Sequence, residues 1–179
     1  MRTYTLNVAG LTRELPLCPI SDKLDIAAFV IFSDVELTVR CTEELLKKID
    51  VDYDIIISAE SKGIPLAYEF ARQTGKQYII ARKSMKFYMT EPLAVKVKSI
   101  TTANVQTLCL SKEYADQVKG KRVLIVDDVI STGESLIALE KLVEAAEGEI
   151  VCKAAILAEG KSADRDDIVF LEKLPVFEK

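Results

Sequence analysis

Uninterrupted aliphatic runs recur along the chain and predict buried strands. The clearest are Ile55–Ile57 and Val123–Val126, neither of which contains a polar residue. A strand whose successive side chains are all apolar is buried on both faces, as in a parallel sheet with helices on each side. The pattern therefore predicts an α/β fold built on a parallel sheet.

Two βαβ units can be placed from this pattern. In the first, a helix that begins near Pro65 and ends at Gly75 joins strands at Tyr53–Ala59 and Gln77–Ala81. Such a crossover brings the carboxyl ends of both strands to the same edge of the sheet.

The second unit starts at a strand over Arg122–Asp128. A helix over about Glu134–Glu147 leads from it into a strand at Glu149–Ala158. Between the two units, alternating hydrophobic and polar residues at Ala94–Lys98 and Val105–Leu110 predict two short strands with a mobile connection.

The first third of the chain is expected to add one strand and one helix. Leu24–Phe32 is strand-like, and Ser33 with Glu36 can form a capping box at the start of a helix. The apolar stripe of that helix consists of Leu37, Cys41, Leu45 and Ile49.

The composition is that of a globular protein and restricts its chemistry. With 179 residues, 49% of them hydrophobic, residues 1–179 are expected to fold as a single domain. Histidine is absent from the sequence, which excludes an imidazole base and an imidazole metal ligand. The net charge of −4 gives no reason to expect nucleic acid or an anionic membrane as a partner.

The cysteines and the longest apolar runs bear on location. The four cysteines are far apart and form no C-x-x-C pair, so reduced thiols in a cytoplasmic protein are expected. No apolar run approaches the roughly 20 residues that a bilayer requires. The first residues also lack the apolar core of a signal peptide.

The stretch VLIVDDVISTGES, Val123–Ser135, carries the strongest candidate chemistry. In an open parallel sheet, ligands bind beyond the carboxyl ends of the strands. Backbone amides near Thr132 open a helix and can hold a phosphate. Asp127 and Asp128 can accept hydrogen bonds from vicinal hydroxyls and bind Mg²⁺ through water. Together these groups suit a phosphorylated sugar, whereas an acid pair alone more often only ends a strand.

The whole stretch closely resembles the 5-phosphoribosyl-1-diphosphate (PRPP) motif of the type I phosphoribosyltransferases. The resemblance implies their α/β parallel sheet with helices on both faces and a small N-terminal hood. It also implies that Asp127 and Asp128 bind the ribose hydroxyls. The residues implied to surround the 5-phosphate are Ser131, Thr132, Gly133, Glu134 and Ser135. Many members have glycine where Glu134 stands, so its side chain is expected to point away from the phosphate.

A second match concerns the diphosphate. SAESKG, Ser58–Gly63, stands where the family has its diphosphate loop, which implies roles for Glu60, Ser61, Lys62 and Gly63. The segment ARK after the next strand resembles a basic element of the adenine and xanthine enzymes that often acts across a dimer interface. Arg82 and Lys83 are thus candidate clamps for the leaving group, the alternative being a pair of surface cations.

The resemblance extends more loosely to the base site. GLTRELPL, Gly10–Leu17, is similar to the segment with which adenine enzymes cover the base, so a hood is expected at about residues 1–24. Backbone contacts to the purine are expected around Arg13, and a mobile lid at about residues 84–104. An apolar wall for the purine is expected from Val129 and Ile130. By similarity to xanthine enzymes, Glu159 and Lys161 are candidates for the base edge, a charged turn being the alternative.

The function implied is transfer of the phosphoribosyl group of PRPP to a purine base, with Mg²⁺ and in a homodimer. Adenine is favoured, although Thr102 falls where adenine enzymes tend to have a lid glutamate. Ser131 replaces the aspartate typical of hypoxanthine/guanine enzymes, which disfavours that subgroup. The alternatives are a xanthine (or guanine) enzyme, a non-catalytic PRPP-binding regulator, or a phosphoryl acceptor domain with an acidic pocket.

Overall fold

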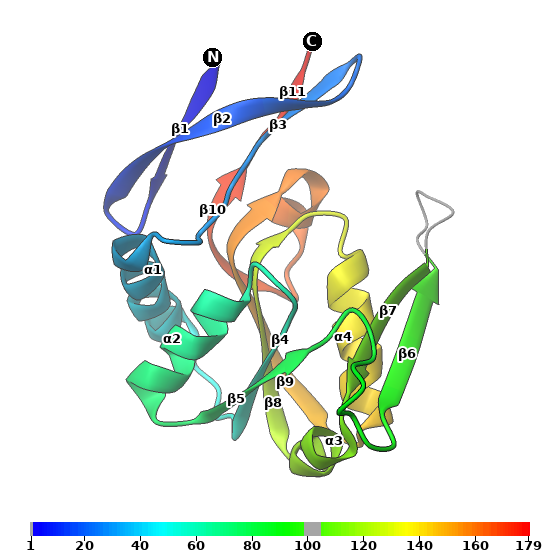
Figure 1. The fold of residues 1–179 in the computed structure, drawn as a ribbon. Helices are drawn as coiled ribbons and strands as arrows, with labels where there is room; N and C mark the ends of the chain where they lie inside the picture. Colours follow the sequence, from blue (N-terminus) through cyan, green and yellow to red (C-terminus); the bar gives the residue numbers. More distant parts are fainter. Residues whose placement is uncertain (1, 99–104) are drawn as a thin grey trace.

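The computed structural model describes residues 2–98 and 105–179 and has a five-stranded parallel sheet at its centre (Figure 1). In spatial order the strands are β10, β9, β8, β4 and β5. Their bounds are Val169–Leu174, Glu149–Glu159, Arg122–Ile130, Ile55–Ala59 and Gln77–Ala81. The predicted α/β fold is confirmed.

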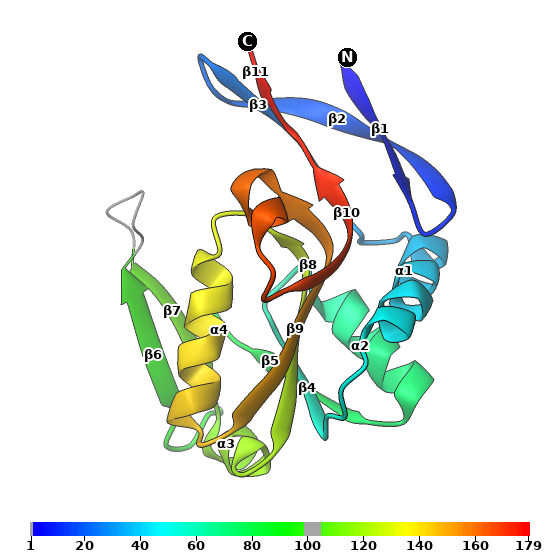
Figure 2. The same ribbon diagram turned by 180° about the vertical axis from the view of Figure 1, so that it is seen from behind.

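Helices cover both faces of this sheet (Figures 1 and 2). α1 (Val35–Lys48) and α2 (Ile64–Thr74) pack on one face, and α4 (Glu134–Ala145) packs on the other. Alternate side chains of β4 enter the two cores, since Ile56 packs with the α1 and α2 cluster while Ile55 and Ile57 pack with that of α4. This is the burial on both faces that the aliphatic runs predicted.

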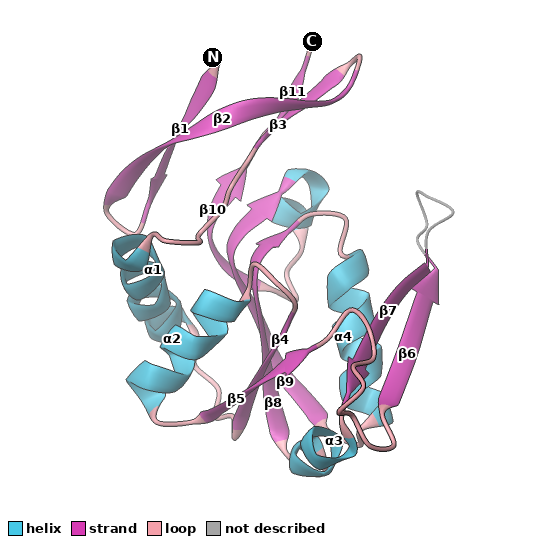
Figure 3. Cartoon of the chain, viewed as in Figure 1, coloured by secondary structure: helices cyan, strands magenta, loops and turns pink. Residues whose placement is uncertain are grey.

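The predicted strands between the two βαβ units form an antiparallel hairpin beside α4 (Figure 3). β6 (Leu93–Lys98) pairs with β7 (Val105–Leu110), and a short helix, α3 (Lys112–Val118), follows. The rest of the expected mobile connection, residues 99–104 with Thr102, lies outside the described residues.

A second sheet lies over the carboxyl ends of the central strands and contains both chain termini (Figures 1 and 2). Its order is β1 (Thr3–Val8), β2 (Leu11–Ser21), β3 (Leu24–Ala27) and β11 (Val176–Glu178). We call it the upper sheet. β11 pairs antiparallel with β3 from the far end of the sequence, with Val176 opposite Ile26.

Two expectations for the first third were wrong. The strand expected over residues 24–32 ends at Ala27, after which the chain turns down toward α1. The cap of α1 is Asp34 instead of Ser33, because the Asp34 carboxylate accepts the backbone N–H of Leu37 at 3.0 Å. Glu36 does not close a capping box, since its carboxylate pairs with Arg13 at 2.8 Å.

The ends of the second βαβ unit also differ from expectation. β8 does not stop at Asp128 but continues to Ile130, because the long strand β9 keeps pairing with it up to Ala158. α4 ends at Ala145, two residues before the expected position. None of the described helices is long and apolar enough to cross a membrane.

Candidate functional site

The candidate site lies where β4 and β8 separate. The two strands pair only as far as Ile57 opposite Ile125, whereas β8 continues beside β9. Asp127 and Asp128 therefore lie on a strand edge that β4 has left, and the loop after β4 faces them. This is the position beyond parallel strands at which ligands are expected.

A cation from the loop after β4 contacts the acid pair. Nζ of Lys62 lies 2.9 Å from Oδ2 of Asp128, whose side chain is only 4% exposed, while that of Lys62 is 45% exposed. The same ammonium group donates to the carbonyl oxygen of Phe29 at 3.4 Å. Oδ2 of Asp128 has no partner with hydrogen-bond geometry among the described residues, so the contact with Lys62 is an ion pair.

Asp127 is the acid whose environment favours its neutral form. Burial raises the pKa of the Asp127 carboxyl well above its usual range, and the neighbouring charge of Asp128 adds to the effect. The backbone N–H of Asp128, which donates to Oδ1 of Asp127 at 2.9 Å, and the charge of Lys62 oppose it. A ligand that donates hydrogen bonds here would favour the ionised form.

Gly63 allows the loop after β4 to approach the acid pair closely. A Cβ atom on Gly63 would lie 2.2 Å from Oγ of Ser58 and 3.1 Å from Oδ1 of Asp127. Glycine is therefore required by contact with neighbouring atoms. The loop predicted for the diphosphate and the acids predicted for the sugar are thus adjacent.

The basic segment after β5 joins the same loop. The Glu60 carboxylate accepts the backbone N–H of Lys83 at 2.9 Å and lies 3.2 Å from Nε of Arg82. The backbone of Arg82 is bound to that of Cys109 by two hydrogen bonds of 2.9 Å. Ser61 and Lys83 are exposed. Residues from two separate segments of the chain, 60–63 and 81–83, therefore form one surface.

The loop after β8 encloses a small hollow at the start of α4. Gly133 has a φ of +79° and is the N-cap of α4, a conformation that glycine adopts without strain. The hollow, of about 40 Å³, is lined by Asp127, Val129, Ile130 and residues 131–136. Ser131 and Thr132 are exposed, and Oγ of Ser135 accepts a hydrogen bond from Gln106 at 3.1 Å. The first amides of α4 therefore open beside Asp127, as an anion site requires.

A larger cavity of about 530 Å³ lies between the upper sheet and the carboxyl end of β9. Its apolar lining comes from the upper sheet: Ile20, Leu24, Ile26 and Val176. Its polar lining consists of Ser131, Thr132, Glu159, Gly160, Lys161, Ser162 and Arg165. Burial raises the pKa of the Glu159 carboxyl, an effect that the charge of Lys62 opposes. An apolar roof over polar edges suits a planar heterocycle.

Comparison with known proteins agrees with this geometry. The family profile of the phosphoribosyl transferase domain matches residues 36–177. The chain belongs to this family. It is 33% identical over 166 residues to a hypoxanthine/guanine phosphoribosyltransferase of Methanococcus voltae, which covers 89% of this chain and 82% of the relative.

Further relatives carry another name. The phosphoribosyltransferase is 31% identical over 149 residues to an adenine phosphoribosyltransferase of Acetivibrio thermocellus, which covers 82% of this chain and 84% of the relative. The solved structure of adenine phosphoribosyltransferase from Thermoanaerobacter pseudethanolicus has the same fold, with a TM-score of 0.74 and 23% identity. It covers 89% of this chain and 95% of that one.

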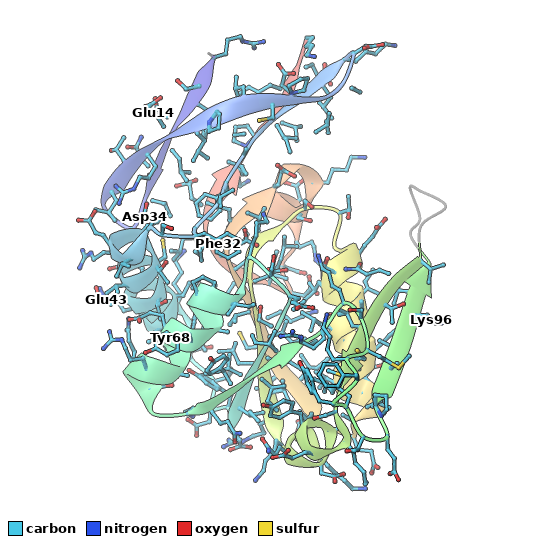
Figure 4. The ribbon with its side chains drawn as sticks, viewed as in Figure 1. Glu14, Phe32, Asp34, Glu43, Tyr68 and Lys96 are labelled. Carbon is cyan, nitrogen blue, oxygen red and sulfur yellow. The ribbon has the colours of Figure 1, made fainter. Side chains whose placement is uncertain are left out.

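Arg13 lies apart from both hollows of this phosphoribosyltransferase. Its guanidinium is bound to Asp34 at 2.7 Å and to Glu36 at 2.8 Å, so it fixes β2 to the start of α1. Figure 4 shows Asp34 at that end of α1, below β1 and β2. The side chain is therefore engaged in holding the upper sheet.

Val129 and Ile130 line the small hollow and are not part of the larger cavity's lining. Ile130 is 3% exposed and packs in the core beside α4.

Sequence reasoning placed Glu159 and Lys161 at this cavity but missed other residues of its lining, among them Ile26 and Val176 of the upper sheet and Ser162 and Arg165 after β9. Arg165 follows the carboxyl end of a parallel strand next to β8, which is a signal that could have indicated it. Val176 carried no such signal, because its place depends on pairing with β3.

Proposed function

We propose that this phosphoribosyltransferase moves the 5-phosphoribosyl group of PRPP to a ring nitrogen of a purine base and releases diphosphate. The observation that carries the proposal is the position of the acid pair between two anion-binding elements. Asp127 and Asp128 have the loop of residues 131–135 on one side and Lys62 on the other. A sugar with phosphate groups at C1 and C5 matches this order of groups.

In the proposed complex each element holds one part of PRPP. The first amides of α4 and the hydroxyls of residues 131–135 bind the 5-phosphate, and the acid pair accepts hydrogen bonds from the ribose hydroxyls. Lys62, Arg82 and Lys83 oppose the charge that develops on the departing diphosphate. The upper sheet covers the base and keeps water from C1, so that the ring nitrogen attacks instead.

Magnesium is part of the proposal, and the residues fit it in a particular way. Among the described residues no three His, Cys, Asp or Glu side chains are grouped to hold a metal ion. Mg²⁺ is commonly bound by one or two carboxylates together with waters and substrate phosphates, a pattern that Asp127 and Asp128 fit. When bound, the ion would offset the negative charge of the diphosphate.

Adenine is the base that we favour, with xanthine or guanine as the alternative. The named relatives include both an adenine and a hypoxanthine/guanine enzyme, and the shared fold is that of an adenine enzyme. Glu159 lies at the polar edge of the larger cavity. In neutral form its carboxyl can donate to N1 of adenine and accept from the exocyclic amine, whereas the ionised form suits the adjacent N–H donors of guanine.

We also propose a cytoplasmic homodimer with a lid over residues 84–104. Exposed apolar side chains support the dimer. Met85, Phe87 and Tyr88 lie within five residues of the end of the basic segment, which resembles an element that often acts across a dimer interface, and they are 62%, 102% and 60% exposed. Phe32 and Tyr68, labelled in Figure 4, are also exposed. The four cysteines are unpaired, as expected in a reducing compartment.

The test is an assay of diphosphate release from PRPP with Mg²⁺ and adenine, xanthine, guanine or hypoxanthine in turn. We expect turnover with at least one purine and the highest kcat/KM with adenine. Highest kcat/KM with another purine would transfer the assignment to that base. If PRPP binds but no purine is turned over, the proposed enzymatic activity is wrong and a PRPP-binding regulator is favoured.

A further inference from the structure

Beyond the groups assigned above, the segment after β9 packs directly on the loop proposed for the 5-phosphate. The 3₁₀ helix η1 (Gly160–Asp164) contains Ser162, which is 5% exposed and donates its hydroxyl to the carbonyl oxygen of Ser131. Arg165 follows η1, and its Nη1 atom is 3.1 Å from the position that a Cβ atom would occupy on Gly133. A guanidinium group therefore lies against the N-cap of α4.

This guanidinium is held in one orientation by Asp167. Nε donates to Oδ1 of Asp167 at 2.8 Å, and Nη2 donates to Oδ2 at 2.7 Å. Asp167 is also bound by Lys153, which pairs with Glu140 of α4 at 2.8 Å. A planar fork fixed by two parallel hydrogen bonds loses little further freedom when it binds an anion.

The two bonds to Asp167 leave Nη1 for another partner. Among the described residues this nitrogen makes no hydrogen bond, although the Arg165 side chain is only 30% exposed. Arg165 lines the larger cavity together with Ser131 and Thr132, the first residues of the phosphate loop. Its donors therefore lie at the rim where that loop opens.

The distribution of charge indicates which end of PRPP this cation serves. Lys62, Arg82 and Lys83 belong to the loops after β4 and β5, which are proposed for the diphosphate. At the opposite end, the loop of residues 131–135 offers the dianionic 5-phosphate amides and hydroxyls, and none of its own side chains is positively charged. A fixed guanidinium is the group that best offsets such an anion.

We propose that Arg165 binds the 5-phosphate of PRPP through Nη1 and that Asp167 positions it. The inference rests on the proposed function, because it assigns a further binding residue to the same site. The competing role is structural, in which Arg165 only braces the turn between β9 and β10 through Asp167.

The test uses two ligands that each represent one end of PRPP. Titration calorimetry would measure the affinity of ribose 5-phosphate and, separately, of diphosphate for the wild type, Arg165→Gln and Arg165→Lys. We expect Arg165→Gln to weaken the affinity for ribose 5-phosphate about tenfold or more and to leave the affinity for diphosphate unchanged. Arg165→Lys, which keeps the charge but loses the fork, should bind ribose 5-phosphate with intermediate affinity.

The matched control is Arg40→Gln, which removes an arginine that pairs with Glu43 on α1 and should alter neither affinity. Unchanged ribose 5-phosphate affinity in folded Arg165→Gln would overturn the proposal. If that variant does not fold, Asp167→Asn decides: a raised KM for PRPP with nearly unchanged kcat supports the positioning role, and an unchanged KM contradicts it. If the wild type binds neither ligand, the proposed function itself fails.

Discussion

At the scale of single residues, the site combines one acid paired with a cation and one acid driven toward its neutral form. Asp128 is buried beside Lys62, whereas the pKa of Asp127 is raised by burial and by its neighbour. Such an arrangement costs stability and is typical of functional sites. The sequence indicated the pair, because two acids directly follow an aliphatic run. It could not indicate the ion pair between Lys62 and Asp128, because the two residues are 66 positions apart in the chain.

Replacing both acids should impair the sugar site without unfolding the protein. We expect Asp127→Asn with Asp128→Asn to raise the KM for PRPP about tenfold or more and to depress kcat, because the ribose hydroxyls lose charged acceptors. Steady-state kinetics at varied PRPP measures the effect. Asp116→Asn, at an exposed residue of α3 that pairs with Lys112, is the control and should behave like the wild type. Unchanged kinetics in the double variant would remove the proposed site.

Asp127 should also make stability depend on pH. The pKa of the Asp127 carboxyl is raised in the folded protein. Below pH 3.8, its ordinary pKa, the carboxyl is protonated in both the folded and the unfolded state, so folding stability is not reduced. As the pH rises through the window between 3.8 and the raised pKa, only the unfolded state ionises freely, and folding stability falls.

We therefore expect Asp127→Asn to be more stable than the wild type at pH 8. Its free energy of unfolding should be higher by about 1 kcal/mol or more, which moves its unfolding midpoint to a higher denaturant concentration. The difference should shrink toward pH 4. Urea unfolding at several pH values measures it, and a difference that is independent of pH would contradict the raised pKa.

At the scale of elements, the site depends on how far each strand continues. β4 stops at Ala59, while β8 runs on to Ile130 beside β9, and the gap between β4 and β8 admits the loop of residues 60–63. The sequence predicted the strands from their aliphatic runs but placed the end of β8 at the acids. Two adjacent charged residues after an aliphatic run predict the end of a strand. In the structure β8 continues past them because it stays paired with β9 up to Ile130.

Gly63 offers a test of this close approach. Gly63→Ala would place Cβ 2.2 Å from Oγ of Ser58, so we expect it to lower the free energy of unfolding by about 1–3 kcal/mol and to raise the KM for PRPP. Ser58→Ala removes that oxygen, which has no hydrogen-bond partner among the described residues, and alone should have little effect.

The double variant Gly63→Ala with Ser58→Ala should regain most of the lost stability. Thermal unfolding and kinetics of the three variants measure the coupling between the two positions. If the double variant loses as much as the sum of the single variants, contact with Ser58 is not the reason for glycine.

At the scale of the whole molecule, two sheets meet over one site. The central sheet supplies the groups proposed for PRPP, and the upper sheet supplies an apolar roof from both ends of the sequence. Periodicity predicted the central sheet because its strands lie within local βαβ units. The pairing of β3 with β11 joins Ile26 to Val176, and no local pattern specifies partners 150 positions apart.

Changes to the apolar lining from the upper sheet should therefore alter the KM for the purine base and not the KM for PRPP. Val176→Asp places a charge on the apolar lining of the larger cavity, and we expect the KM for the purine to rise about tenfold while that for PRPP stays within about twofold. Glu178→Gln, an exposed neighbour on β11, is the matched control. A change in the KM for PRPP alone would contradict the division between the two sheets.

A crystal structure of the protein soaked with PRPP and Mg²⁺ would show where each part of the substrate lies. We expect the 5-phosphate in the loop of residues 131–135, the ribose hydroxyls on Asp127 and Asp128, and the diphosphate beside Lys62. PRPP bound anywhere else, or ribose hydroxyls turned away from both acids, would contradict the proposed site.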